Sequence, residues 1–367
     1  MSPAVHLYIH IPFCLRICPY CAFYKHMLGR SDLEGFVRAV AEEARLRLPH
    51  GYAPETIYFG GGTPSLLSPK HLDILVEGLK RTVDFSRVKE WSFESNPATF
   101  TTAKAEQWAR LGITRVSLGA QSFEPELLKL LGRTHSPAQI EQSIAMLRAA
   151  GIPQVNIDLM FSLPGQTTEQ WRHTLECAIT QNPDHISTYN LTYEEDTAFF
   201  EAFGADANDE ETDVAMFTLA DELLTAAGYR HYEISNFARN GNVSHHNLAC
   251  WRGEDYFGLG PGAYGTTAGT RYHNTEDTAA YTAALKAGHL PEFSQEHISA
   301  EARRTELLGL KLRTDEGLPP ELLREQDADL IRLLQQEGLA TLAADGRLLL
   351  TLRGRLLADE IAVQLLG

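Results

Sequence analysis

Short apolar runs alternate with amphipathic stretches along the first half of the chain. The runs are typical of buried strands, and the stretches carry apolar residues every three or four positions, as helices do. Strands are predicted just before Cys14 and over residues 56–59, 91–94, 115–118, 154–160 and 185–190. Helices are predicted over residues 31–48, 68–83, 102–111, 136–150 and 167–180. Six strands separated by helices indicate βαβ units, so we predict an α/β fold with a parallel sheet, either doubly wound or a barrel.

The rest of the chain has a different pattern. A helix is predicted over residues 209–227 and a strand over 229–237, and the chain is then rich in Gly and Asn to about residue 270. Helices over 302–312, 326–337 and 353–366 surround a hairpin that turns at Asp345-Gly346, in the order of a winged helix. We therefore predict a (β/α) domain over residues 1–240, a connecting region over 241–295, and a small winged-helix-like α+β domain over 296–367.

Charge and composition argue against several classes of partner. The net charge of −16 disfavours an extended surface for nucleic acid or anionic membranes, because phosphate binding needs clustered Lys and Arg. The winged-helix-like segment has no basic surface either, since residues 301–367 carry nine Lys and Arg against twelve Asp and Glu. No run of eighteen apolar residues and no signal-peptide pattern is found, so we expect a cytoplasmic protein with reduced thiols.

Three of the five cysteines, Cys14, Cys18 and Cys21, lie in one short stretch with the spacing C-x3-C-x2-C. Three thiolates on one loop can hold three irons of an iron–sulfur cluster and leave the fourth iron open to another ligand. A structural zinc site would need a fourth ligand nearby, and the chain has neither a second cysteine pair nor a C-x2-H pair. Disulfide bonding would leave one of the three unpaired. The spacing therefore predicts a cluster site.

With these cysteines the chain resembles the radical S-adenosylmethionine (SAM) superfamily, in which the open iron chelates the amino and carboxylate groups of SAM. The stretch Tyr8-Ile-His-Ile-Pro-Phe-Cys14, followed by Cys18, Cys21 and Phe23, is similar to the branch that holds oxygen-independent coproporphyrinogen III oxidases and heme chaperones. The resemblance covers nearly the whole chain. It implies an incomplete parallel (β/α)6 barrel over the first domain, a [4Fe-4S] cluster on the three cysteines, and bound SAM.

Polar residues at the carboxyl ends of the predicted strands are candidates for binding SAM, because ligands of parallel α/β domains bind there. The stretch Gly60-Gly-Gly-Thr-Pro64 offers backbone groups that a ligand can approach closely, although a tight turn would explain the same glycines. Carboxylates suit the hydroxyl and ammonium groups of SAM, and a guanidinium suits its carboxylate. Arg133 could instead pair with Glu126 on one helical face.

Matches to family motifs select particular residues. The glycine stretch and the motifs S-F-E-S-N-P, G-A-Q-S-F, L-G-R-T-H and N-I-D-L-M imply SAM contacts for Gly61, Gly62, Thr63, Glu94, Gln121, Arg133 and Asp158. The resemblance also places Tyr8 at a porphyrin or SAM contact and Tyr20 against the adenine. Aromatic core packing is the alternative for both tyrosines.

A second candidate site is the stretch Ser244-His-His246-Asn-Leu-Ala-Cys250-Trp251. Histidine and cysteine are both axial ligands of heme iron, although a loop histidine is often satisfied by backbone groups. The stretch resembles the H-N-x-x-Y-W motif of the heme chaperone branch, which implies heme binding through His246. Cys250 replaces the tyrosine of that motif and is either a second heme ligand or a conservative buried replacement.

Two other features are given no function. Residues 258–263 match the dinucleotide fingerprint G-x-G-x-x-A, but Pro261 removes an N–H and neither a useful strand nor a helix is predicted around it. Cys177 lies in an amphipathic helical stretch and is predicted to be an inert buried thiol.

Two functions fit the resemblance. The first is an oxygen-independent coproporphyrinogen III oxidase, and the second is a chaperone that holds heme and passes it to a client apoprotein. Oxidases of the family carry a fourth cysteine, C-x3-C-x2-C-x-C, and a substantial extension before the cluster strand, whereas here Ala22-Phe23 follows Cys21 and thirteen residues precede Cys14. We favour the chaperone and expect little or no decarboxylation of coproporphyrinogen. If the client is a respiratory-chain apoprotein in a membrane, the chaperone would contact that membrane peripherally. A heme-degrading or methyl-transferring radical enzyme is the third alternative.

Overall fold

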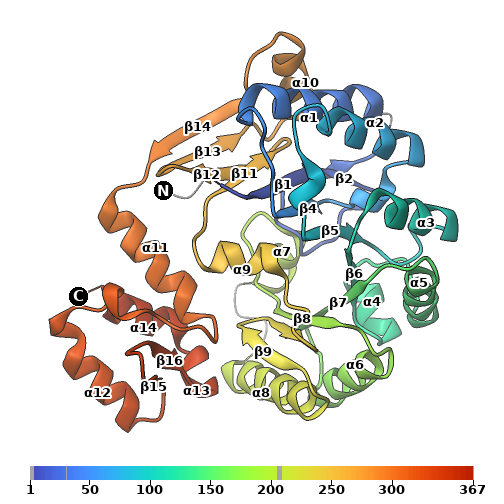
Figure 1. Ribbon diagram of the computed structural model, residues 1–367. Coiled ribbons are helices and arrows are strands. Elements are labelled where there is room, and N and C mark those ends of the chain that lie inside the picture. Colours follow the sequence, from blue (N-terminus) through green and yellow to red (C-terminus); the bar gives the residue numbers. More distant parts are fainter. Residues whose placement is uncertain (1–3, 30, 205–208, 367) are drawn as a thin grey trace.

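The computed structural model describes residues 4–29, 31–204 and 209–366. Its centre is a mixed twelve-stranded sheet in the order β14-β13-β12-β11-β1-β4-β5-β6-β7-β8-β10-β9 (Figure 1). The middle six strands are mutually parallel, as predicted. They are β1 (His6–Ile11), β4 (Thr56–Gly61), β5 (Glu90–Ser95), β6 (Arg115–Gln121), β7 (Gln154–Phe161) and β8 (His185–Asn190).

Helices follow these strands, and six of them cover the outside of the sheet as one layer (Figure 1). They are α1 (Leu33–Arg47), α2 (Pro69–Leu79), α3 (Thr102–Leu111), α5 (Pro137–Ala149), α6 (Thr168–Thr180) and α8 (Glu210–Ala226). The short helices α4 (Pro125–Leu130) and α7 (Ala198–Phe203) contribute instead to a separate apolar cluster that includes Leu163 and Leu191. The predicted strands and helices of this region are therefore present, with ends shifted by a few residues. Asp32 caps the first helix by accepting from the N–H of Gly35.

The core lies between the strands and this helical layer. All residues of β6 except Gln121 are buried, as expected for a strand covered on both faces. Large aromatic side chains fill this core. The ring of Phe59 packs against those of Trp91 and Phe93, and Phe93 packs in turn against Trp108, with ring centroids 4.9–5.9 Å apart. This packing fixes the strand ends, where the polar residues lie.

Both edges of the sheet differ from the prediction. The predicted strand over 229–237 is two antiparallel strands, β9 (Arg230–Glu233) and β10 (Asn236–Ala238). The Gly- and Asn-rich region is not a loop, because it contains α9 (His245–Trp251), β11 (Tyr256–Leu259) and β12 (Tyr264–Thr267). Strand β11 pairs with β1 in parallel, and β12, β13 (Thr270–Asn274) and β14 (Glu292–His297) extend that edge, with α10 (Thr278–Lys286) between the last two. Residues 260–263 form the turn between β11 and β12, so no helix follows the fingerprint-like glycines.

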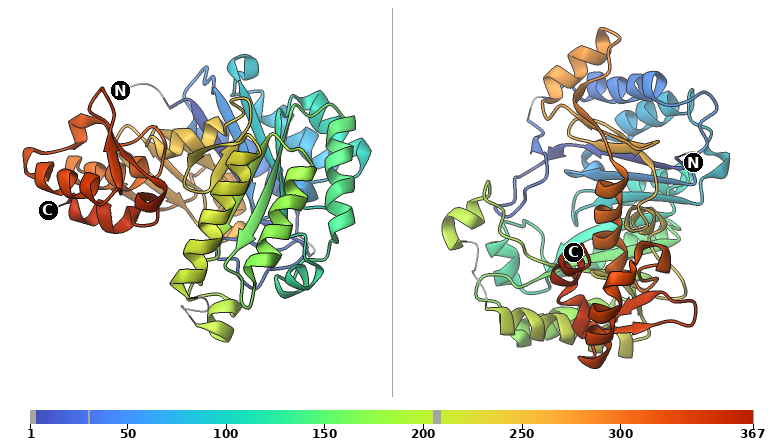
Figure 2. Two further views of the ribbon diagram at one scale, coloured as in Figure 1. Left: turned by 90° about the horizontal axis from the view of Figure 1, so that it is seen from below. Right: turned by 90° about the vertical axis from the view of Figure 1, so that its left-hand side faces the viewer.

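The C-terminal segment has a small core of its own, formed by Leu308, Leu348, Ile361, Leu365 and their neighbours. Its elements are α11 (Ala300–Leu312), α12 (Ala328–Gln336), β15 (Ala340–Leu342), β16 (Leu348–Leu350), α13 (Leu352–Arg355) and α14 (Ala358–Gln364). The predicted last helix is thus two helices. Figures 1 and 2 show the segment at one side of the sheet, which it meets through ion pairs such as that of Arg230 on β9 with Asp315. Among the described helices, none combines the length and apolar character needed to cross a bilayer.

Candidate cluster and cofactor site

The cysteine loop and the glycine loop are fixed against each other. Strand β1 continues into β2 (Phe13–Cys14), which pairs with β3 (His26–Met27), and the loop between them carries Cys18 and Cys21. In the glycine loop, the N–H of Gly62 donates to Ile11 O over 2.8 Å and that of Thr63 to Phe13 O over 2.8 Å. A Cβ at Gly62 would lie 2.7 Å from Phe13 O, so only glycine allows this approach.

A cavity of about 470 Å³ opens at the carboxyl ends of the parallel strands. Its lining includes most of the predicted site, namely Cys14, Cys18, Tyr20, Cys21, Gly61, Gly62, Thr63, Glu94, Gln121, Arg133 and Asp158. These residues come from the cysteine loop, from strands β4, β5, β6 and β7 or directly after them, and, for Arg133, from the segment after α4, and the fold brings them to one place. Tyr8, His246 and Cys250 are not among the lining residues.

Two thiols of the cysteine loop accept hydrogen bonds from polar side chains. The hydroxyl of Thr63 donates to Cys14 Sγ over 3.7 Å, and Arg133 Nη1 donates to Cys18 Sγ over 3.8 Å. Hydrogen bonds to sulfur are a usual feature of iron–sulfur sites, where they tune the thiolate ligands. Among the described residues no three His, Cys, Asp or Glu side chains converge on a single ion, but a cubane cluster takes its thiolates on separate irons. The donor set therefore fits a cluster, and burial raises the pKa of the Cys14 and Cys21 thiols.

Glu94 lines the cavity at the end of β5. It accepts from Tyr58 Oη over 2.8 Å and from the N–H of Gly61 over 3.0 Å. Burial nevertheless raises the pKa of Glu94 to about 7, and the nearby Asp158 adds to the shift. Gly61 adopts φ +107°, and a Cβ there would lie 2.4 Å from the His10 ring, so this turn needs glycine. With this pKa the Glu94 carboxyl can be charged or neutral near neutral pH, so it can bind either a cationic group or a hydroxyl group of a cofactor.

Asp158 and Arg133 line the same cavity as Glu94. Asp158 accepts from Ser117 Oγ over 2.8 Å and from Asn156 Nδ2 over 2.7 Å. Arg133 Nη2 donates to Gly119 O over 3.1 Å, while its buried Nε has no partner. No ion pair joins Arg133 to Glu126 within the described ranges. The guanidinium therefore keeps a free donor near the cavity, as binding of a carboxylate requires.

Two further residues of the cavity were not predicted. Tyr58 donates its hydroxyl to Glu94. Strand alternation places Tyr58 on the same face of β4 as Gly60, at the start of the glycine loop. Asn96 Nδ2 donates to Thr63 Oγ1 over 3.0 Å and lines the cavity beside Gly119. Asn96 stands inside the motif S-F-E-S-N-P, which is the signal that could have identified it.

His246 and Cys250 lie at the opposite end of the strands, on α9. The ring of His246 packs against Tyr58 with centroids 5.1 Å apart, and its Nδ1 lies 2.9 Å from Thr56 Oγ1 at the start of β4. Glu90 accepts from the N–H groups of His245 and His246, which begins the helix. Burial lowers the pKa of His246 to about 3 and raises that of Cys250 to about 12.

The remaining residues singled out in the sequence contact mainly aromatic and histidine rings. The hydroxyl of Tyr8 lies 2.9 Å from His10 Nδ1, and its ring stacks on Tyr58 beneath the cavity. Tyr20 lies beside Phe199 with centroids 6.1 Å apart, and burial raises its pKa. Cys177 is not buried as predicted: it is half-exposed on α6, with Sγ 3.4 Å from His173 Nε2.

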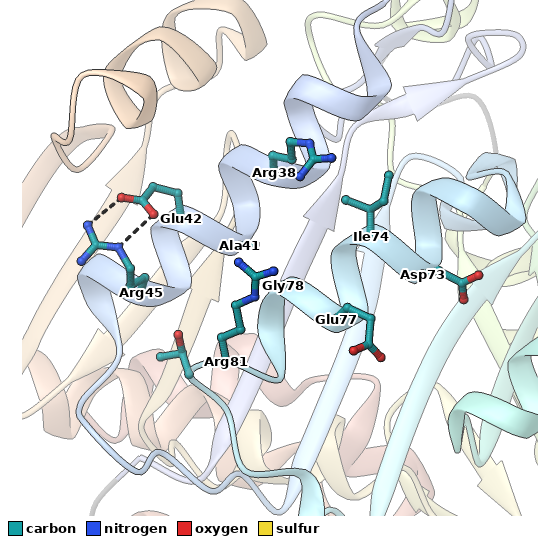
Figure 3. A pocket seen from close by; sticks show the side chains of 10 residues that line it. Arg38, Ala41, Glu42, Arg45, Asp73, Ile74, Glu77, Gly78 and Arg81 are labelled. Atoms are coloured by element: carbon teal, nitrogen blue, oxygen red, sulfur yellow. Dashed lines mark hydrogen bonds and ion pairs between the residues drawn. The ribbon is translucent and has the colours of Figure 1, made fainter.

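A second cavity, of about 530 Å³, lies between α1 and α2 on the outside of the helical layer (Figure 3). Among its charged side chains, Arg45 donates to Glu42 over 2.6 and 2.9 Å. Gly78 allows the two helices to approach there, because a Cβ would lie 2.5 Å from that of Ala41. We assign this cavity to helix packing.

Comparison with known proteins places the chain in a family. The profile of the Radical SAM superfamily matches residues 8–178. The heme chaperone HemW of Mycobacterium tuberculosis (strain H37Rv) is 35% identical over 374 residues, which cover 98% of this chain and 94% of that protein. The chain belongs to the HemW family. HemW of Bacillus subtilis (strain 168) is 32% identical, with 98% of both chains covered.

Solved structures agree with this assignment at the level of the fold. Coproporphyrinogen III oxidase (HemN) from Escherichia coli, a radical SAM enzyme, aligns with a TM-score of 0.83 at 23% identity, covering 98% of this chain and 89% of the other. The predicted membership of the radical SAM superfamily is confirmed, and the α/β fold with a mostly parallel sheet is the fold of that superfamily.

Proposed function

We propose that this protein is a heme chaperone that carries a [4Fe-4S] cluster and SAM and delivers heme to a client hemoprotein. The observation that carries the proposal is the similarity to proteins named heme chaperone HemW over 98% of the chain. The donor set of the cavity supports the cofactors, because three thiols lie beside a glycine loop and an arginine with a free donor. The client is a hemoprotein such as a respiratory-chain apoprotein, reached from the cytoplasm.

The proposal assigns roles to residues of the cavity. Cys14, Cys18 and Cys21 hold the cluster, which when reduced can pass an electron to bound SAM. Arg133 binds the SAM carboxylate, and Glu94 and Asp158 bind its ammonium and hydroxyl groups. The proposed SAM set is completed by Tyr20, Gly61, Gly62, Thr63 and Gln121. Tyr8 acts indirectly, by stacking under Tyr58.

The proposal also includes the finer architecture. The six parallel strands form an incomplete (β/α)6 barrel in residues 1–240, residues 241–295 connect it, and residues 296–367 form a winged-helix-like domain. The open order of the sheet supports the incomplete barrel, since β14 and β9 are its edges. The separate apolar core of the C-terminal segment supports the last domain.

One experiment separates the chaperone from the oxidase. The protein is reconstituted anaerobically with iron and sulfide, and the same preparation is titrated with heme and assayed with coproporphyrinogen, SAM and a reductant. We expect stoichiometric heme binding and no decarboxylated product. Turnover to protoporphyrinogen would contradict the chaperone, and Cys18→Ala serves as the control that lacks one cluster ligand.

A further inference from the structure

Four large apolar side chains of the cysteine loop are exposed. They are Leu15, Ile17, Phe23 and Met27, with exposed fractions of 60%, 46%, 72% and 50%. We call these four residues the collar. Exposed apolar residues that gather on one loop mark an interaction site, whereas single ones scattered over a surface need no explanation.

The collar adjoins the cofactor cavity. Phe23 belongs to the cavity lining, and Leu15 and Ile17 stand on either side of Arg16, which also lines it. Met27 pairs with Cys14 in the β2–β3 ladder, so it lies beside the first thiol. The collar therefore belongs to the chain segment that carries the three thiols, and it meets the cavity at Phe23.

The volume of the cavity decides what the collar can hold. About 470 Å³ is the size of a site for one drug-sized ligand. A cluster and SAM together occupy such a space, so a third large ligand has to lie at the mouth, against the collar. His246 offers no alternative surface in this fold, because it is 4% exposed and lies at the other end of the strands.

The charges at the mouth fit one class of ligand. Arg16 and Lys25 line it, and Glu194 is the acidic residue on the opposite loop. Heme is a flat apolar ring with carboxylates at one edge, which requires an apolar surface with cations beside it. We propose that heme binds on the collar, with its ring against Ile17 and Phe23 and its propionates toward Arg16 and Lys25. This inference rests on the proposed function.

Heme titration of variants tests the inference. The protein holding cluster and SAM is titrated with iron protoporphyrin IX and with its dimethyl ester, followed by absorbance. The double variant with Ile17→Ser and Phe23→Ser should bind heme with a Kd about tenfold higher or more, because apolar contact with the ring is lost. Arg16→Gln should weaken binding of heme but not of the ester, whose propionates carry no charge.

Matched controls locate the effect. Phe293 on β14 is 75% exposed and far along the sheet from the cluster strand, so Phe293→Ser should bind heme as the wild type does. His246→Ala should also retain binding. Iron content is measured first, and if the double variant fails to hold its cluster, the single variant Phe23→Ser replaces it.

The outcomes separate the two proposals. Heme binding unchanged by the collar exchanges would overturn the collar as the heme site and leave the chaperone function intact, and loss of binding in His246→Ala alone would do the same. A wild-type protein that binds no heme would overturn the proposed function itself. Equal effects of Arg16→Gln on heme and on the ester would contradict the role given to the propionates.

Discussion

Glu94 shows how a single residue couples the cavity to pH. Its folded pKa is about 7 and its ordinary value is 4.5, so folding favours the protonated form. The stability that this group contributes is present below pH 4.5 and is lost as pH rises through 7. We predict that Glu94→Gln stabilises the cluster-free protein by about 3 kcal/mol at pH 8 and by less than about 1 kcal/mol at pH 5, as measured by urea denaturation. An equal gain at both pH values would contradict this explanation.

For single residues, the sequence predicted which functional groups take part more easily than it predicted where each side chain lies in the fold. The thiols, Glu94, Arg133 and Asp158 were found because their motifs carry the groups that a cluster and SAM require, and the fold brings them to one cavity. The surroundings of His246 could not be predicted, since its motif does not reveal that α9 packs at the amino ends of the strands. The supporting role of Tyr58 was missed because it depends on a contact with Glu94 across two strands.

Glu43 joins separate elements of the fold. On α1 it accepts from the N–H of Gly260, from Asn274 Nδ2 and from Tyr281 Oη over 2.8, 2.8 and 2.6 Å, and it pairs with Arg47. Removing one partner of a buried ion pair leaves the other charge uncompensated. We predict that Glu43→Ala lowers the free energy of unfolding by about 3 kcal/mol in urea denaturation.

The neighbouring position provides the control for this prediction. Glu42 pairs with Arg45 on the exposed side of α1, where an ion pair contributes less than about 1 kcal/mol. Glu42→Ala should therefore change the unfolding free energy little (Figure 3). Similar losses in the two variants would mean that Glu43 does not join α1 to the sheet edge.

Elements were predictable where their pattern is long and local. The six parallel strands and their helices have such patterns, whereas β11 has four residues, one of them Gly258, and pairs with a strand almost 250 positions away. Nothing in its own sequence reveals that partner. The last predicted helix breaks at Leu356 and Leu357, between α13 and α14. Within α13, Gly354 packs on Leu339 O, where a Cβ would lie 1.9 Å away, and this contact is likewise non-local.

Over the whole molecule, the cluster and heme are expected to depend on one loop. Residues 15–25 contain no helix or strand and are tied to the rest of the fold by individual hydrogen bonds, at Cys18, Pro19 and Tyr24, and not by a strand ladder. Three iron–thiolate bonds would hold this loop in one conformation, and with it the collar. A site that one ligand orders binds a second ligand more tightly, and the effect is reciprocal.

We therefore predict that removal of the cluster by an iron chelator weakens heme binding about fivefold or more, as measured by heme titration before and after chelation. By the same linkage, saturating heme should lower the equilibrium iron loss of the holoprotein at a fixed chelator concentration. Cys18→Ala is the control, because chelation should not weaken its heme binding further. Equal heme affinity with and without the cluster would show that the two ligands do not share the loop, since linked sites cannot ignore each other's occupancy.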